Sequence, residues 1–277
     1  MIVQLWGTRG SLPSSGPETV GYGGNTAAVE VLGADGTILA LDAGTGIRRL
    51  GAAIDPSVER VDVLLTHLHM DHIQGLGFFA PFFRPSGEIH IWGPASATLE
   101  LRTRLTRYLS PPLFPVRIRD LEARVVLHDA PDQPVNIGGF VVVAQHVIHP
   151  GATVGYRISA DGATIAYLPD HEPALSTSRF PAEPDWTSGR ELAAGVDLLI
   201  HDGQYTDEER QARVGWGHSS VTEAVAFGEL AEAKRLILFH HDPSHTDVML
   251  DALTDQARAC AATIEVTAGR EGDRYEL

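Results

Sequence analysis

The segment at residues 66–72 brings together four side chains that can bind metal ions: His67, His69, Asp71 and His72. The apolar residues 61–65 directly before it are typical of a β-strand. Side chains two positions apart on an extended backbone point the same way, so His67 and His69 could hold one ion together. Asp71 and His72 lie one step further on and could reach a second ion. Their nitrogen and oxygen donors favour zinc-class metals.

Other apolar runs end in residues of the same kind. The runs that begin at residues 164, 197 and 235 lead to Asp170, His201 and His240. In α/β proteins the carboxyl ends of strands carry ligand-binding residues at one edge of a sheet. A single histidine at a strand end is more often a buried or capping residue. Together with the cluster at 67–72, these positions nevertheless predict one shared site.

The periodicity of the rest of the chain predicts an α/β fold. We expect strands at residues 3–6, 27–32, 37–41, 61–65, 89–92, 124–127, 140–145, 154–158 and 164–168. A helix is expected at 45–53, and helices at 189–194, 221–233 and 247–262 alternate with strands at 198–201, 236–239 and 264–266. The proline clusters at 111–112 and 181–184 are typical of surface loops rather than linkers. We therefore expect one domain over residues 1–277.

Composition restricts the location and the partners. The single cysteine, Cys260, excludes an intramolecular disulfide, fits a reducing cytoplasm and is expected to be a buried small side chain. We expect no signal peptide and no membrane association, because no apolar run approaches spanning length. The formal net charge of −15 argues against binding extended nucleic acid, which needs clustered basic side chains.

One local group of basic residues departs from the acidic average: Arg102, Arg104, Arg107, Arg117, Arg119 and Arg124. Charge runs of this kind are usually solvated surfaces with internal ion pairs, and we favour that interpretation. The alternative is a rim that collects anions beside the metal site.

The chain resembles the metallo-β-lactamase-fold hydrolases, and within them the ribonuclease Z and cyclic-phosphodiesterase branch. His67-Leu68-His69-Met70-Asp71-His72 matches the HxHxDH signature, and His149 precedes Gly155-Tyr156 by six residues as in that branch. Asp170 and Leu238-Phe239-His240 fit the later ligand positions. Trp6-Gly7-Thr8-Arg9-Gly10-Ser11, Tyr22-Gly23-Gly24-Asn25-Thr26 and Leu41-Asp42-Ala43-Gly44-Thr45-Gly46 are also similar to the branch.

The resemblance implies a four-layer αββα sandwich with two divalent metal ions. One ion would bind His67, His69 and His149; the other would bind Asp71, His72 and His240; Asp170 would bridge them. In such centres a hydroxide between ions about 3.5–4 Å apart is the nucleophile. The donors fit zinc, and also manganese or iron. His146 and His241 are alternative ligands, but their register favours an orienting role behind His149 and His240.

His218 is the second candidate for chemistry, because it precedes a helix start in which Ser220 and Glu223 are spaced as a capping box. In similar ribonuclease Z-like enzymes a matching histidine pairs with an acidic residue and serves the leaving group. We therefore expect His218 to be a general acid or phosphate ligand oriented by Asp202, with Asp71 as the third catalytic residue. Asp42 is expected to anchor the turn at 42–46, and His245 stays unassigned.

The expected function is metal-dependent hydrolysis of a small or cyclic phosphodiester, with a small-molecule substrate. The fold does not determine the substrate, so a lactonase or thioesterase on the same centre is the first alternative. A metal-containing binding or regulatory module with little turnover is the second. Loops around residues 113–116 could serve a homodimer.

Overall fold

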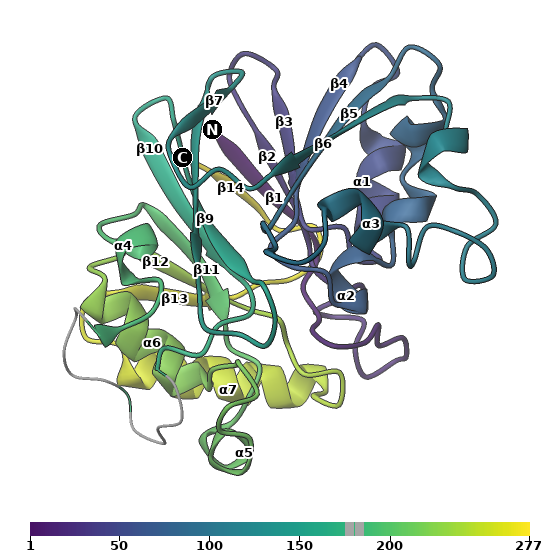
Figure 1. Cartoon of the computed structure of the whole chain (residues 1–277). Coiled ribbons are helices and arrows are strands. Elements are labelled where there is room, and N and C mark those ends of the chain that lie inside the picture. The colour runs from purple at the N-terminus through teal and green to yellow at the C-terminus, as the bar shows by residue number, and fades with distance from the viewer. Residues whose placement is uncertain (175–179, 181–185) are drawn as a thin grey trace.

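The computed structural model describes residues 1–174, 180 and 186–277, and two seven-stranded sheets face each other within it (Figure 1). The first sheet has the order β14-β1-β2-β3-β4-β5-β6 and the second has the order β13-β12-β11-β10-β9-β8-β7. The strands of the first sheet are β1 (Ile2–Gly7), β2 (Ala28–Leu32), β3 (Ile38–Leu41), β4 (Arg60–Leu64), β5 (Glu88–Gly93), β6 (Arg124–Asp129) and β14 (Arg274–Glu276). Those of the second are β7 (Val135–Ile137), β8 (Phe140–His146), β9 (Val154–Ala160), β10 (Ala163–Leu168), β11 (Leu198–Asp202), β12 (Arg235–Phe239) and β13 (Glu265–Ala268).

Helices cover the outer face of each sheet (Figure 1). The α-helices are α1 (Ile47–Ala53), α2 (Met70–Ile73), α3 (Leu101–Leu105), α4 (Arg190–Ala193), α5 (Asp207–Ala212), α6 (Val221–Leu230) and α7 (Asp247–Cys260). Single 3₁₀ turns are η1 (Leu76–Phe78), η2 (Ala80–Phe83) and η3 (Ile118–Asp120). None of the helices in the described residues is both long enough and apolar enough to cross a membrane.

Three hydrophobic cores correspond to the three interfaces between four layers. The central core joins the inner faces of the two sheets, with Leu41 and Leu64 from the first and Tyr156 and Phe239 from the second. A second core packs α4, α6 and α7 on the second sheet, and a third packs α1 and the 3₁₀ turns on the first. The alternation of buried and part-buried residues along β1 is the pattern of a strand with one face in the core. The expected αββα sandwich is confirmed.

The topology of the second sheet brings three strand ends to one edge. Strands β10, β11 and β12 are parallel neighbours, and Leu168, His201 and Leu238 lie side by side in register. The residues that follow each strand therefore leave the sheet at the same edge. The first sheet reaches this edge through β4, and the Val154 amide donates to the Thr66 carbonyl at 2.9 Å, which ties the two sheets together beside the site.

The sequence-based element boundaries differ from the structure in a few places. The short strands β7 and β14 and the helices α2 and α5 are additional, and α1 begins at residue 47 rather than 45. Ser220 and Glu223 do form the capping box at the start of α6. Cys260 is exposed, because it is the last residue of α7 and faces solvent, so the expectation that it is buried is wrong. The proline cluster at 181–184 lies outside the described residues.

Candidate metal centre

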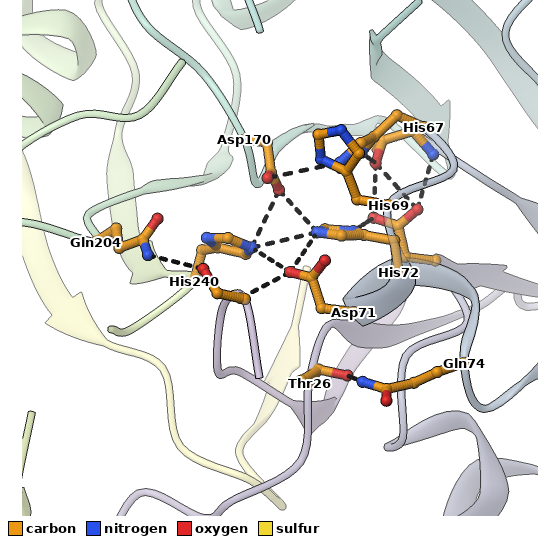
Figure 2. Close-up of polar contacts among 12 residues, drawn as sticks. Thr26, His67, His69, Asp71, His72, Gln74, Asp170, Gln204 and His240 are labelled. Atoms are coloured by element: carbon orange, nitrogen blue, oxygen red, sulfur yellow. Dashed lines mark hydrogen bonds and ion pairs between the residues drawn. The ribbon is translucent and has the colours of Figure 1, made fainter. Parts of the chain in front are cut away.

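All seven residues expected to bind metal gather at the common edge of the two sheets. Figure 2 labels six of them, all except His149. The ligand segment after β4 supplies four of them, of which Asp71 and His72 lie in the short helix α2. The loop after β8 supplies His149, and Asp170 and His240 follow β10 and β12. The cluster is buried except at His69, which is exposed to solvent.

The first group of donors consists of His67, His69 and His149, whose ligand atoms lie within 4.8 Å of one another. The His149 Nε2 atom is 3.2 Å from the His69 Nδ1 atom. Two imidazole nitrogens this close present their lone pairs to one point, as ligands of a single ion do.

The second group consists of Asp71, His72 and His240, again with ligand atoms within 4.8 Å. The Nε2 atoms of His72 and His240 are 3.2 Å apart, and the His240 Nε2 atom lies 3.1 Å from the Asp71 Oδ2 atom. The His240 ring leaves no room for a side chain at Gly10, where a Cβ atom would lie 2.3 Å from the His240 Nδ1 atom.

Asp170 lies between the two groups and turns one oxygen toward each. Its Oδ2 atom is 3.7 Å from His67 Nε2 and 3.6 Å from His149 Nε2. Its Oδ1 atom is 2.9 Å from His72 Nε2 and 3.3 Å from His240 Nε2. This division of one carboxylate between two donor groups is the arrangement expected of a bridging ligand.

The outward-facing ring nitrogens are bound by fixed partners, which orient the imidazoles. The His72 Nδ1 atom is 2.8 Å from the Asp42 Oδ2 atom, and the His67 Nδ1 atom is 3.1 Å from the Thr66 hydroxyl. The Thr66 amide and hydroxyl both donate to Asp42, at 2.7 Å and 2.9 Å. The His149 Nδ1 atom is 2.8 Å from the Gly217 carbonyl. In each case the Nε2 atom is directed into the cluster.

The role expected for Asp42 is therefore wrong in its details. Asp42 does not fasten its own turn; its side chain holds the ligand segment through Thr66 and His72 and also accepts from the Tyr167 hydroxyl at 3.0 Å. The sequence signal that could have indicated this is the position of Asp42 directly after β3, the strand next to β4.

Burial and mutual interaction strongly shift the titration of these groups. Burial lowers the pKa of His67 well below its ordinary value and lowers the pKa of His149 to about 4, so both are neutral donors. Burial alone would raise the pKa of Asp170, but His240 and the neighbouring imidazoles hold it well below its usual range. The pKa of His72 is raised well above its ordinary value despite burial, because Asp170, Asp71 and Asp42 surround it.

The side chains fit divalent cations, by an observation independent of the family resemblance. The His67 Nε2 atom is buried without a hydrogen-bond partner, although buried polar atoms almost always have one. The carboxylates of Asp71 and Asp170 bring negative charge to the same buried place. Imidazoles and carboxylates gathered at one buried place form a donor set for zinc, manganese or iron.

His218 and Asp202 lie against both donor groups. The His218 Nδ1 atom is 2.7 Å from the Asp202 Oδ2 atom, and the His218 ring stacks on His240 at 5.1 Å between centroids. The ring centroid of His149 lies 4.9 Å away on another side. Asp202 is fully buried, and its carboxylate also accepts the amides of His171 and Gln204. The expected pair is thus assembled beside the cluster.

Other histidines singled out from the sequence point elsewhere. His201 bonds to His171 at 2.8 Å between ring nitrogens, and both rings pack against Phe227 behind the site. His146 is exposed, with its Nδ1 atom 3.2 Å from the Thr153 carbonyl. His201 is therefore a core residue rather than a ligand, because strand alternation turns it away while Asp202 faces the cluster.

His241 and His245 also have partners outside the ligand set. The His241 Nε2 atom lies 2.9 Å from the Gly269 carbonyl, and the His245 Nε2 atom lies 3.1 Å from the Glu209 carboxylate. The orienting roles expected of His146 and His241 are not reflected in these contacts, because each bonds a backbone carbonyl away from the ligands.

The group of arginines makes several internal contacts. Arg124 bonds Glu88 at 2.9 Å, Arg119 pairs with Asp120 at 3.6 Å, and Arg104 donates to the Pro94 carbonyl. These contacts agree with the favoured interpretation of a solvated surface with its own partners.

A buried carboxylate that the sequence analysis did not single out fixes the loop before His218. Glu172 accepts the amides of Gly215 and Gly217 at 3.0 Å and 2.9 Å and pairs with Arg210 at 2.9 Å. The Gly217 carbonyl in turn accepts a hydrogen bond from the His149 ring. Glu172 therefore positions a candidate ligand through the backbone of residue 217. Its place two residues after Asp170 was the only available signal.

Comparisons with known proteins agree with this geometry. A family model described as a beta-lactamase superfamily domain matches residues 37–241. An uncharacterised protein of Mycobacterium tuberculosis is 31% identical over 245 residues, covering 82% of this chain and 81% of that protein. Ribonuclease Z of Mycobacterium marinum is 27% identical over 293 residues, covering 94% and 92%. The structure of the metallo-beta-lactamase fold protein YhfI from Bacillus subtilis matches with a TM-score of 0.73 and 21% identity, covering 100% of this chain and 99% of YhfI.

Proposed function

Because this chain belongs to the metallo-β-lactamase superfamily, in its ribonuclease Z-like branch, we propose that it is a dinuclear metal-dependent phosphodiesterase for small or cyclic substrates. The two donor groups on either side of Asp170 support two ions, with His67, His69 and His149 around one and Asp71, His72 and His240 around the other. Divalent ions, when bound, supply Lewis acidity and an activated water molecule.

The observation that carries the phosphodiester assignment is the pair formed by His218 and Asp202. Breaking a P–O bond to an alkoxide leaving group is assisted by a proton on the departing oxygen, and a side chain with a suitable proton must be close to it. Asp202 holds the His218 Nδ1 atom at 2.7 Å, so the Nε2 atom faces away from Asp202 and can deliver that proton. Asp202 also stabilises the imidazolium before transfer, because its carboxylate is buried and fixed by backbone amides.

A small substrate is favoured over extended nucleic acid by charge. The formal net charge of −15 repels a long phosphate backbone, whereas a single phosphodiester needs only the local positive charge of the centre. The ribonuclease Z relatives act on RNA by name, and the proposal departs from them on this point. We also propose a cytoplasmic location and a homodimer through residues 113–116, where Leu113 is 70% exposed.

The test is turnover by protein loaded with zinc, manganese or iron. Bis(p-nitrophenyl) phosphate, a panel of cyclic nucleotides and an acyl-lactone are assayed side by side, with the His240→Ala variant as a control. The proposal requires hydrolysis of a phosphodiester that is lost in His240→Ala. Turnover of the lactone alone would instead assign an acyl hydrolase, and no turnover of any ester would assign a binding module. Light scattering of the purified protein tests the dimer.

A further inference from the structure

Ser11 contacts the candidate metal centre, although the proposed chemistry gives it no role. Its backbone amide donates to the Asp71 Oδ2 atom at 2.7 Å, and the residue itself is exposed. Gly10 before it packs against His240 so closely that any side chain there would collide with the imidazole. Residues 10–11 therefore pack directly against the donor group that contains Asp71, and Ser11 lies between that group and the solvent.

The backbone of Ser11 adopts a conformation that serine rarely takes. Its φ angle is 58°, in the left-handed region that glycine enters without cost. The amide contact with Asp71 needs only a backbone, so glycine would make it equally well. A serine at a strained backbone position beside a reactive centre points to a use for its side chain.

Gln204 fixes the direction in which the Ser11 hydroxyl can donate. The Gln204 Nε2 atom donates to the Ser11 Oγ atom at 3.1 Å. The Ser11 oxygen is then an acceptor toward Gln204, and its own hydrogen is left to donate elsewhere. Figure 2 shows Gln204 at the edge of the cluster, next to His240.

We propose that the Ser11 hydroxyl donates a hydrogen bond to a non-bridging oxygen of the substrate phosphoryl group. This inference rests on the proposed function and identifies a substrate-binding residue for it. The Ser11 Oγ atom lies within roughly 6 Å of Asp71 Oδ2, because the amide of the same residue is 2.7 Å from that oxygen. A tetrahedral anion bound at a metal-loaded centre would therefore be within reach of the Ser11 hydroxyl. A charged phosphoryl oxygen accepts such a bond strongly, whereas a neutral lactone does not carry this charge.

The test measures binding of inorganic phosphate, separately from turnover, by calorimetry on metal-loaded protein. Ser11→Gly removes the hydroxyl and relieves the backbone, and Ser11→Ala removes the hydroxyl alone. Ser14→Ala is the matched control, because the Ser14 hydroxyl on the same loop is engaged with the Pro243 carbonyl at 2.9 Å. Metal content is measured for every variant by mass spectrometry.

Both Ser11 variants are expected to keep their metals and to bind phosphate roughly tenfold more weakly, as the loss of one hydrogen bond to a charged group predicts. Ser14→Ala should bind as the wild type does. Unchanged phosphate affinity in both Ser11 variants overturns the inference, and so does a wild-type protein that binds no phosphate. Phosphate binding that depends on Ser11, in a protein that hydrolyses no phosphodiester, would support this contact and refute the proposed function.

Discussion

The Nδ1 atom of His218 and the Oδ2 atom of Asp202 are separated by 2.7 Å, and Asp202 has no exposed surface. A buried carboxylate that is also held by two backbone amides cannot move away from its partner without leaving polar groups unpaired. The ring is therefore held with its Nδ1–H group donating to Asp202, and Nε2 is the atom available to a substrate.

If His218 protonates the leaving group, the cost of His218→Ala depends on that group. Substrates with an alkoxide leaving group should lose roughly 10²–10⁴-fold in kcat. Substrates that release p-nitrophenolate should lose far less, because a weakly basic leaving group needs little help from an acid. Rates for a series of esters with increasing leaving-group pKa measure this. An equal loss across the series, with metals retained, would show that His218 does not act as the acid.

Asp170→Asn should disturb both metal sites, whereas His240→Ala should disturb one. Asp170 turns an oxygen toward each donor group, and replacement by an amide removes the charge that both groups share. We expect Asp170→Asn to lower the affinity for both ions by at least about 100-fold, exceeding the losses caused by changes to outer partners. Calorimetric titration of the metal-free protein resolves the two events. Retention of two ions by Asp170→Asn would contradict a bridging role.

Asp42→Asn should weaken metal binding without touching a ligand. Asp42 orients His72 directly and His67 through Thr66, and loss of such a partner typically costs 10–100-fold in metal affinity. Asp55→Asn is a matched control, since that carboxylate is exposed and bonds Ser57 on the surface. Equilibrium titration with a competing chelator compares the variants. Equal metal affinity in the Asp42→Asn and Asp55→Asn variants would show that Asp42 does not support the metal ligands.

Acid should destabilise the protein through the buried pair of His201 and His171. Burial lowers the pKa of His201 to about 4 in the folded chain, compared with about 6.5 when exposed. Between these values the unfolded state binds a proton that the folded state does not, so stability falls as the pH falls from 6.5 toward 4. The slope approaches about 1.4 kcal/mol per pH unit for one proton. Urea unfolding across this range should show a shallower slope for His201→Gln, and an identical slope would contradict the assignment.

The ligands could be predicted from the sequence because they are metal-binding residue types placed directly after apolar strands. His67, Asp170 and His240 each follow an apolar strand. Parallel pairing of β10 and β12 with β11 carries Asp170 and His240 to one edge, and His67 reaches that edge from β4 in the facing sheet. The HxHxDH spacing and the family resemblance then supplied the grouping. His201 shows the limit of the argument, because a strand end has two faces and the apolar run does not reveal which one meets the site.

The supporting residues could not be predicted in the same way. Asp42, Tyr167 and Glu172 act through contacts between segments far apart in the chain, and no periodicity records those contacts. Ser11 is a further case, since its left-handed backbone is visible only in three dimensions. Buried polar contacts of this kind depend on how two sheets pack, which a strand pattern does not specify.

The hydrogen bond from Tyr167 to Asp42 links the two sheets of the fold. Tyr167 belongs to β10 in one sheet and Asp42 follows β3 in the other, and Asp42 also holds His72. The contacts of Asp42 with Tyr167 and His72 thus connect the two sheets at the candidate metal centre. Amide hydrogen exchange should therefore accelerate in β4 and β10 together when the metals are withdrawn, as a single cooperative opening unit. Faster exchange in α2 alone would show that the hydrogen bond between Tyr167 and Asp42 does not couple the opening of the two sheets.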